Sequence, residues 1–159
     1  MEHTHSERGA HGAPAQSLNR LALAATWHCL TGCAIGEILG LVIATTFGWG
    51  NLASIAVAVV LAFFFGYSLT LRPLVAGGVP LRRAARVALA ADTVSITVME
   101  IVDNGFVLLV PGAMEAGLPD FLFWWSLGVS LAIAFVAAFP VNRILVARGR
   151  GHAVMHAYH

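Results

Sequence analysis

The chain has 159 residues, of which 58% are hydrophobic and 11% are charged. Soluble domains carry about a quarter charged residues, so this chain, with a mean hydropathy of +0.81, cannot cover a water-facing surface. Its formal net charge of +1 offers no basic stripe for phosphates, which indicates that nucleic acid is not a partner. We therefore expect an all-α integral membrane protein embedded in a lipid bilayer.

In chain order, a polar tail comes first, over residues 1–20, and it contains His3, His5 and His11. Four apolar runs follow, and each is long enough to cross a hydrocarbon core of about 30 Å with some tilt. They cover about 21–47, 52–71, 84–110 and 121–146. A His-rich tail, residues 148–159, comes last. The pattern predicts a four-helix transmembrane bundle as one membrane domain, residues 21–147.

The arginines fall on one side of this predicted topology. The loop between the second and third runs and the two tails carry arginine, and the other two loops carry none. Basic residues flank the cytoplasmic ends of membrane helices. We therefore expect a multi-pass protein of the bacterial cytoplasmic (inner) membrane with both termini in the cytoplasm.

The first run holds residues that are costly in hydrocarbon. Cys29, Cys33 and Glu37 share one stripe of a helix, and His28 begins the neighbouring stripe. Ionisable side chains inside a membrane mark ion sites or proton relays by default. That neighbouring stripe continues as a ladder of small residues that favours close helix packing. The ladder consists of Gly32, Gly36 and Gly40; the sequence does not separate packing within one chain from a homodimer through this face.

The third run carries polar residues that could face those of the first run. Asp92, Met99 and Asp103 share one helix face, with Glu100 beside them. The first and third runs enter from the same side, so a rise of 1.5 Å per residue places their polar residues at equal depths. Two layers result. The inner, metal-binding layer is His28, Cys29, Cys33 and Asp92; the outer layer, an ion or proton pathway, is Glu37, Met99, Glu100, Asp103 and Asn104. Cys29 and Cys33 should lie near Asp92, and Glu37 near Glu100 or Asp103.

The donor types suggest which ion is bound. Thiolates and imidazole favour soft or borderline ions, here Cu(I) or Zn(II), while carboxylates favour harder ions or protons. The C-terminal tail could collect metal as an auxiliary site. Its candidate ligands are His152, Met155, His156 and His159. No organic cofactor is indicated.

The same residues resemble a known family. The segments that carry the resemblance are His28-Cys29-Leu30-x-Gly32-Cys33-x-x-Gly36-Glu37, Phe63-Phe64-Phe65-Gly66-Tyr67, Ala91-Asp92-Thr93 with Met99-Glu100-x-x-Asp103-Asn104, and Phe139-Pro140-Val141-Asn142-Arg143. Together, over about 26–147, they resemble the bacterial membrane family catalogued as domain of unknown function 4396. The resemblance implies a small helical membrane protein and implies no particular activity.

Three functions follow from these observations. The first is a membrane protein that binds and moves a metal ion, Cu(I) or Zn(II), through the His/Cys/carboxylate site. The second is a proton-coupled carrier or a proton conductor without metal. The third is a membrane assembly or interaction protein that transports nothing and has a structural polar core. An enzyme is not expected, because no zinc-protease helix, nucleophile elbow or cofactor loop occurs.

Overall fold

The computed structural model describes residues 17–148, and within this range the regular structure consists of four long α-helices. Their bounds are α1 Leu18–Phe47, α2 Asn51–Ala76, α3 Leu81–Leu109 and α4 Phe121–Ala147. The predicted tails at 1–16 and 149–159, with the metal ligands expected there, lie outside the described residues. The four apolar runs thus correspond to four helices.

The helix ends follow local chemistry. Ser17 caps α1, because its side chain accepts a hydrogen bond from the backbone N of Arg20. α1 therefore begins at Leu18, inside the segment expected to be tail. At its other end Gly48 adopts a left-handed conformation, with φ of 65°, which suits glycine. α2 continues past Pro73 to Ala76, because one more turn closes when Gly77 N bonds to Pro73 O at 2.9 Å.

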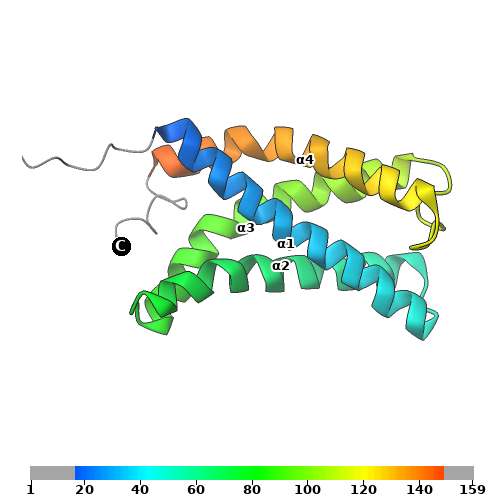
Figure 1. Cartoon of the computed structure of the whole chain (residues 1–159), viewed down its shortest axis with the longest axis horizontal. Coiled ribbons are helices and arrows are strands. Elements are labelled where there is room, and N and C mark those ends of the chain that lie inside the picture. The colour runs from blue at the N-terminus through cyan, green and yellow to red at the C-terminus, as the bar shows by residue number, and fades with distance from the viewer. Residues whose placement is uncertain (1–16, 149–159) are drawn as a thin grey trace, which may run out of the picture.

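The helices alternate in direction, so their ends gather in two groups (Figure 1). The start of α1, the end of α4 and the turn between α2 and α3 lie at one end of the bundle. The turn between α1 and α2 and the longer loop between α3 and α4 lie at the other. α1 crosses the bundle diagonally, packs against α2 and α4, and also contacts α3. α1 and α3 therefore run in the same direction.

The glycine ladder of α1 packs against α2 within the chain. A Cβ atom at Gly32 would lie 2.9 Å from Gly66 Cα, and one at Gly40 would lie 2.6 Å from Ala58 Cα. Gly36, between them, faces the backbone of Ala62 in the same way. The expected close helix packing is therefore confirmed, and its partner is α2. Because α2 occupies this face, a homodimer would have to use another surface.

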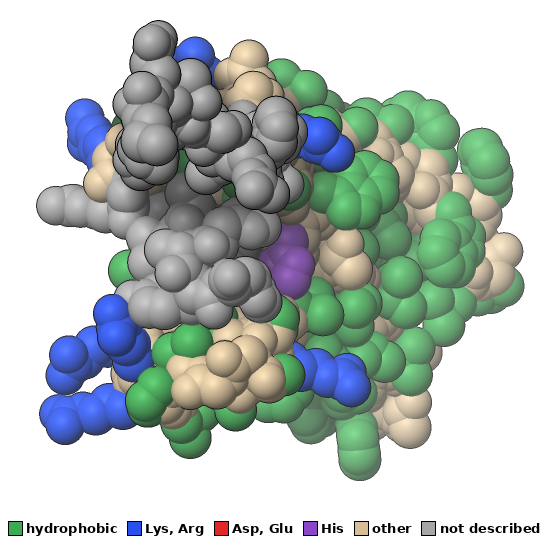
Figure 2. Space-filling model, turned by 60° about the vertical axis from the view of Figure 1, so that its left-hand side comes forward, with side chains coloured by type: hydrophobic (Ala, Val, Ile, Leu, Met, Phe, Trp, Pro, Cys, Tyr) green, Lys and Arg blue, Asp and Glu red, His purple; other side chains and the backbone are tan. Residues whose placement is uncertain are grey.

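Three helices, α1, α2 and α4, are long and apolar enough to cross a membrane. The surface agrees with a lipid-embedded protein, because large apolar side chains are exposed along the flanks, among them Trp27, Val60 and Val136. Figure 2 shows hydrophobic side chains over most of one face and arginines gathered at one end. No acidic side chain of the described residues is visible on that face. Among the acidic side chains of residues 17–148, Asp92, Glu100 and Asp103 are buried and Glu37 is half-buried, whereas Glu115 and Asp120 are exposed.

Candidate functional site in the bundle interior

A buried hydrogen-bond triad joins α1, α3 and α4 near the arginine-bearing end. Asn142 Nδ2 donates to Thr26 Oγ1 at 3.0 Å and to Ser95 Oγ at 2.9 Å. All three side chains are buried. Because the three residues come from three helices, the triad fixes how those helices are aligned. Sequence reasoning assigned them no role, although a lone asparagine in an apolar run is itself a signal of a buried polar contact.

Next along the interior, α1 and α3 bring Cys29 and Asp92 together. Cys29 Sγ donates to Asp92 Oδ1 at 3.9 Å, and both side chains are fully buried. This proximity confirms what their equal depths predict. Thr70 of α2 also lies against the Asp92 carboxyl, and its Oγ1 is 3.3 Å from His28 Nε2. Thr70, which sequence reasoning missed, thus connects the histidine to the carboxyl group.

One turn further from the arginine end, Cys33 meets a different carboxyl group. Its thiol lies against Glu100 rather than against Asp92, which corrects the expectation for this residue. Cys33 is one turn deeper than Cys29, so its neighbour on α3 is correspondingly deeper. Asn104 Nδ2 donates to Glu100 Oε2 at 3.3 Å and to the Glu100 carbonyl at 3.0 Å. Each cysteine therefore pairs with its own carboxyl group.

The third pair consists of two carboxyl groups. Glu37 of α1 lies against Asp103 of α3, one of the two neighbours that the sequence predicts for it, and Asn104 is beside Glu37. Ser130 of α4 donates a short hydrogen bond to Asp103 Oδ1. Sequence reasoning missed Ser130, because a serine in an apolar run also bonds to its own helix, as Ser130 does to Leu127 O.

Three carboxylate oxygens in this interior lack a donor. They are Glu37 Oε1, Glu100 Oε1 and Asp103 Oδ2, and none has a hydrogen-bond partner among residues 17–148. A buried acceptor without a donor costs free energy. Two ionised carboxylates in contact also repel each other. A proton on one carboxyl group of the Glu37–Asp103 pair would remove both costs, because it would supply the missing donor.

The four residues predicted as a metal site do not converge on one point. Within the described part of the chain, no three His, Cys, Asp or Glu side chains are close enough together to hold one ion. His28 is next to Thr70, Cys29 is next to Asp92, and Cys33 is next to Glu100. The residues are arranged as successive pairs along α1 and α3, and that arrangement suits transfer between groups better than tetrahedral coordination.

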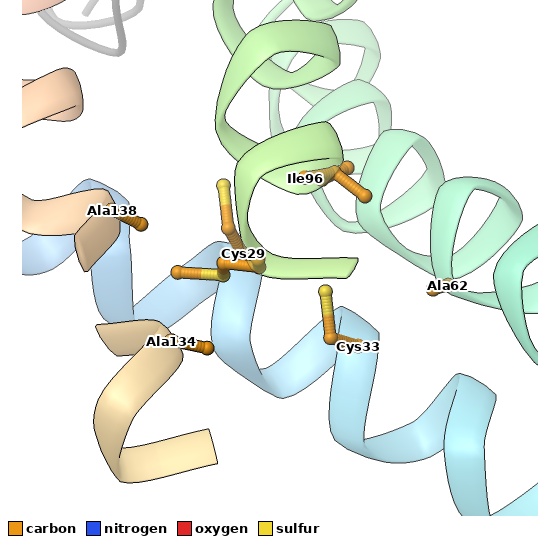
Figure 3. Close-up of a cluster of buried hydrophobic side chains, with 7 residues drawn as sticks. Cys29, Cys33, Ala62, Ile96, Ala134 and Ala138 are labelled. Carbon is orange, nitrogen blue, oxygen red and sulfur yellow. The ribbon is translucent and has the colours of Figure 1, made fainter. Parts of the chain in front are cut away.

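The sulfur atoms are nevertheless concentrated. Cys29, Cys33 and Met99 are fully buried in one cluster with Ile96, and both cysteines are free thiols. Figure 3 shows the two cysteines one turn apart on α1, with Ala134 and Ala138 of α4 on one side and Ile96 on the other. Small alanine side chains around the thiols leave the helices close together. Met99, which was placed in the outer layer, belongs to this thiol cluster.

Comparisons with known proteins identify the family. The comparison with curated proteins and the comparison with solved structures gave no match. Residues 19–151 match the family described as domain of unknown function (DUF4396). This range covers all four helices apart from Leu18 and includes every buried polar residue described above. The chain therefore belongs to the DUF4396 family.

Proposed function

We propose that this protein is a four-span protein of the bacterial inner membrane that transfers protons through its buried carboxyl groups, alone or coupled to a small solute. α3 would be the fourth span, although its sequence is less apolar than that of the other three helices. Its acidic residues Asp92, Glu100 and Asp103 are buried against neighbouring helices. Beyond its first turns, which expose Arg82, Arg83 and Arg86, its exposed large side chains, such as Val94 and Ile101, are apolar. The helix therefore offers lipid a mostly apolar face.

The orientation follows from the two ends of the bundle. The arginines of the described range lie near the start of α1, the end of α4 and the α2–α3 turn, which form one end of the bundle (Figure 1). The opposite end has Glu115 and Asp120 and no arginine. The positive-inside rule supports a cytoplasmic location for the arginine end, and hence for both termini.

The observation that carries the proton proposal is the contact between Glu37 and Asp103. Both carboxyl groups have an oxygen without a donor, and Asp103 is 1% exposed. A proton shared by such a pair would supply the missing donor and remove the repulsion between two carboxylates, and an arriving cation would compete with it. Buried acidic residues in membrane helices act as proton relays in pumps and transporters. Ser130 would position Asp103 by its hydrogen bond.

The acidic residues of α3 also extend across part of the membrane thickness. Asp92 and Asp103 are separated by a rise of about 16 Å along the helix, roughly half of the hydrocarbon thickness. Cys29 and Cys33 lie beside the inner and middle carboxyl groups, and their thiols can form weak hydrogen bonds with them. The series therefore runs Asp92, Glu100, Asp103 from the cytoplasmic to the outer half.

The direct test is proton flux into liposomes that contain the purified protein, compared with the Glu37→Gln variant.

A second candidate function is Cu(I) handling at the thiol cluster. Its specific support is the joint burial of Cys29, Cys33 and Met99, because Cu(I) is a soft ion that thiolate and thioether ligands select. This site would use Met99 in place of His28 and Asp92. Copper content of protein purified after Cu(I) loading, compared with the Met99→Leu variant, tests it separately from proton flux.

A further inference from the structure

A pocket opens at the outer end of the bundle, directly next to the Glu37–Asp103 pair. It has a cavity volume of about 70 Å³ and is lined by all four helices and by the α3–α4 loop. On this measure one water needs roughly 10–15 Å³, so the pocket could hold about five waters or a molecule of similar size. Because each helix contributes to its wall, the pocket is a feature of the whole bundle.

The lining has one charged group and a mainly apolar wall. Its polar part includes Glu37, a member of the carboxyl pair, and Asn104 beside it. The apolar wall includes Leu41, Ile55 and Val107. No arginine or lysine lines the pocket, so no cationic side chain there would balance the charge of an anion. A ligand that fits this lining has one positive end and a compact apolar body.

The missing hydrogen-bond donor at Glu37 favours the same kind of ligand, one with a positively charged end. Glu37 Oε1 lacks a donor among the described residues, and an ammonium group offers three. A bare metal ion fits less well, because hard cations need six or more oxygen ligands and this wall is mostly apolar. A neutral apolar molecule would leave the buried oxygen without a donor, at a cost in free energy.

We propose that this outer pocket binds a small organic amine, with its ammonium group on Glu37 and its apolar body against Leu41, Ile55 and Val107. The inference rests on the proposed proton function, because it names the solute to which proton transfer is coupled. The ammonium and a proton compete for the same carboxyl group. Binding of the cation therefore requires that the Glu37–Asp103 pair release its proton. Under this competition the protein would exchange an ammonium ion for a proton.

The test is calorimetric titration of the full-length protein in lipid nanodiscs. The probe is isobutylammonium, and isobutanol is its neutral isostere. We expect saturable binding of the amine and no comparable binding of the alcohol. Glu37→Gln should weaken amine binding by about tenfold or more, because a charge-assisted hydrogen bond is lost. Glu115→Gln removes the same charge from an exposed side chain outside the pocket and should leave binding unchanged.

A second variant keeps the proposal testable if Glu37→Gln does not fold. Val107→Phe fills the pocket without changing charge, and it should also weaken amine binding by about tenfold or more. Equal binding of amine and alcohol, or equal amine binding by the wild type and both pocket variants, would overturn the proposal. The two proposals fail separately. Proton flux without amine binding would refute only the pocket assignment, whereas amine binding without flux would refute only the transport function.

Discussion

Cys29 Sγ lies 3.9 Å from Asp92 Oδ1, although the two residues are 63 positions apart in the sequence. The contact joins α1 to α3, which run in the same direction through the bundle. Because it fixes their relative depth, the next polar residues along each helix also meet: Cys33 with Glu100, then Glu37 with Asp103. One alignment thus produces the whole series of buried pairs.

Asn142 should stabilise this alignment. In the Asn142→Ala variant the hydrogen bonds to Thr26 and Ser95 disappear, and two hydroxyl groups lose their donor. Interhelical hydrogen bonds in membranes contribute about 0.6 kcal/mol each, so we expect a loss of about 1–2 kcal/mol in the free energy of unfolding. Reversible unfolding in mixed detergent micelles measures it. Asn51→Ala, which removes only a 3.5 Å contact of an exposed asparagine, is the control and should change the free energy by less than about 0.5 kcal/mol.

A methyl group added at Gly36 should destabilise the fold, whereas one added at Gly128 should not. The Gly36 Cβ would collide with the backbone of Ala62, and a Cβ at Gly128 would meet nothing within 4 Å. We expect Gly36→Ala to lower the free energy of unfolding by about 1–3 kcal/mol, as overpacking does. Gly128→Ala should raise it slightly, because alanine favours a helix. Equal effects of the two substitutions in thermal unfolding would show that α1 and α2 are not packed this closely.

Much of this architecture could be predicted from the sequence, because hydrophobic runs and helical periodicity determine it. The four runs correspond to four helices, and the depth comparison correctly placed Cys29 near Asp92. It left Glu100 and Asp103 open as neighbours of Glu37, and Asp103 is the nearer partner in the structure. Helix rise is constant, so residues at equal depth on two helices that run in the same direction meet if those helices are neighbours. That condition holds for α1 and α3.

The contributions of α2 and α4 to the interior could not be predicted in the same way. Thr70 and Ser130 are small hydroxyl residues, whose side chains often bond only to their own helix. Nothing in the local pattern shows that Thr70 reaches His28 or that Ser130 reaches Asp103. The predicted four-ligand metal site stays a prediction: within residues 17–148 no three of the usual ligands gather, since equal depth does not make side chains converge on one point.

Cysteine labelling should reveal the proposed orientation. Cys29 and Cys33 are 0% and 1% exposed, so they should not react in the folded protein and give no background. An added thiol at Glu115→Cys should react with a membrane-impermeant maleimide in intact cells. A thiol at Gly77→Cys, in the α2–α3 turn, should react only after the cells are permeabilised. The reverse pattern would place the arginine end outside.

Metal retention should distinguish soft from borderline ions. Zn(II) requires about four nitrogen, oxygen or sulfur ligands, and the described residues do not bring three of the usual ones together. After loading and dialysis, we expect well under one Zn(II) per chain. Any Cu(I) that remains should be lost in the Cys29→Ser/Cys33→Ser double variant. Zn(II) bound at one equivalent and lost in the double variant would support the four-ligand site that the sequence predicts.

The contact between Glu37 and Asp103 is the centre of the proposed mechanism, and proton flux tests it most directly. Purified protein is reconstituted in liposomes with an internal pH dye, and a potassium gradient with valinomycin drives proton entry. Glutamine at position 37 keeps the size of the side chain and can donate a hydrogen bond to Asp103, so Glu37→Gln should fold. We predict flux for the wild type and for Glu115→Gln, and only the rate of empty liposomes for Glu37→Gln and Asp103→Asn. Equal flux in all four proteins, or none in any of them, would contradict the proton function and favour a purely structural role for the polar interior.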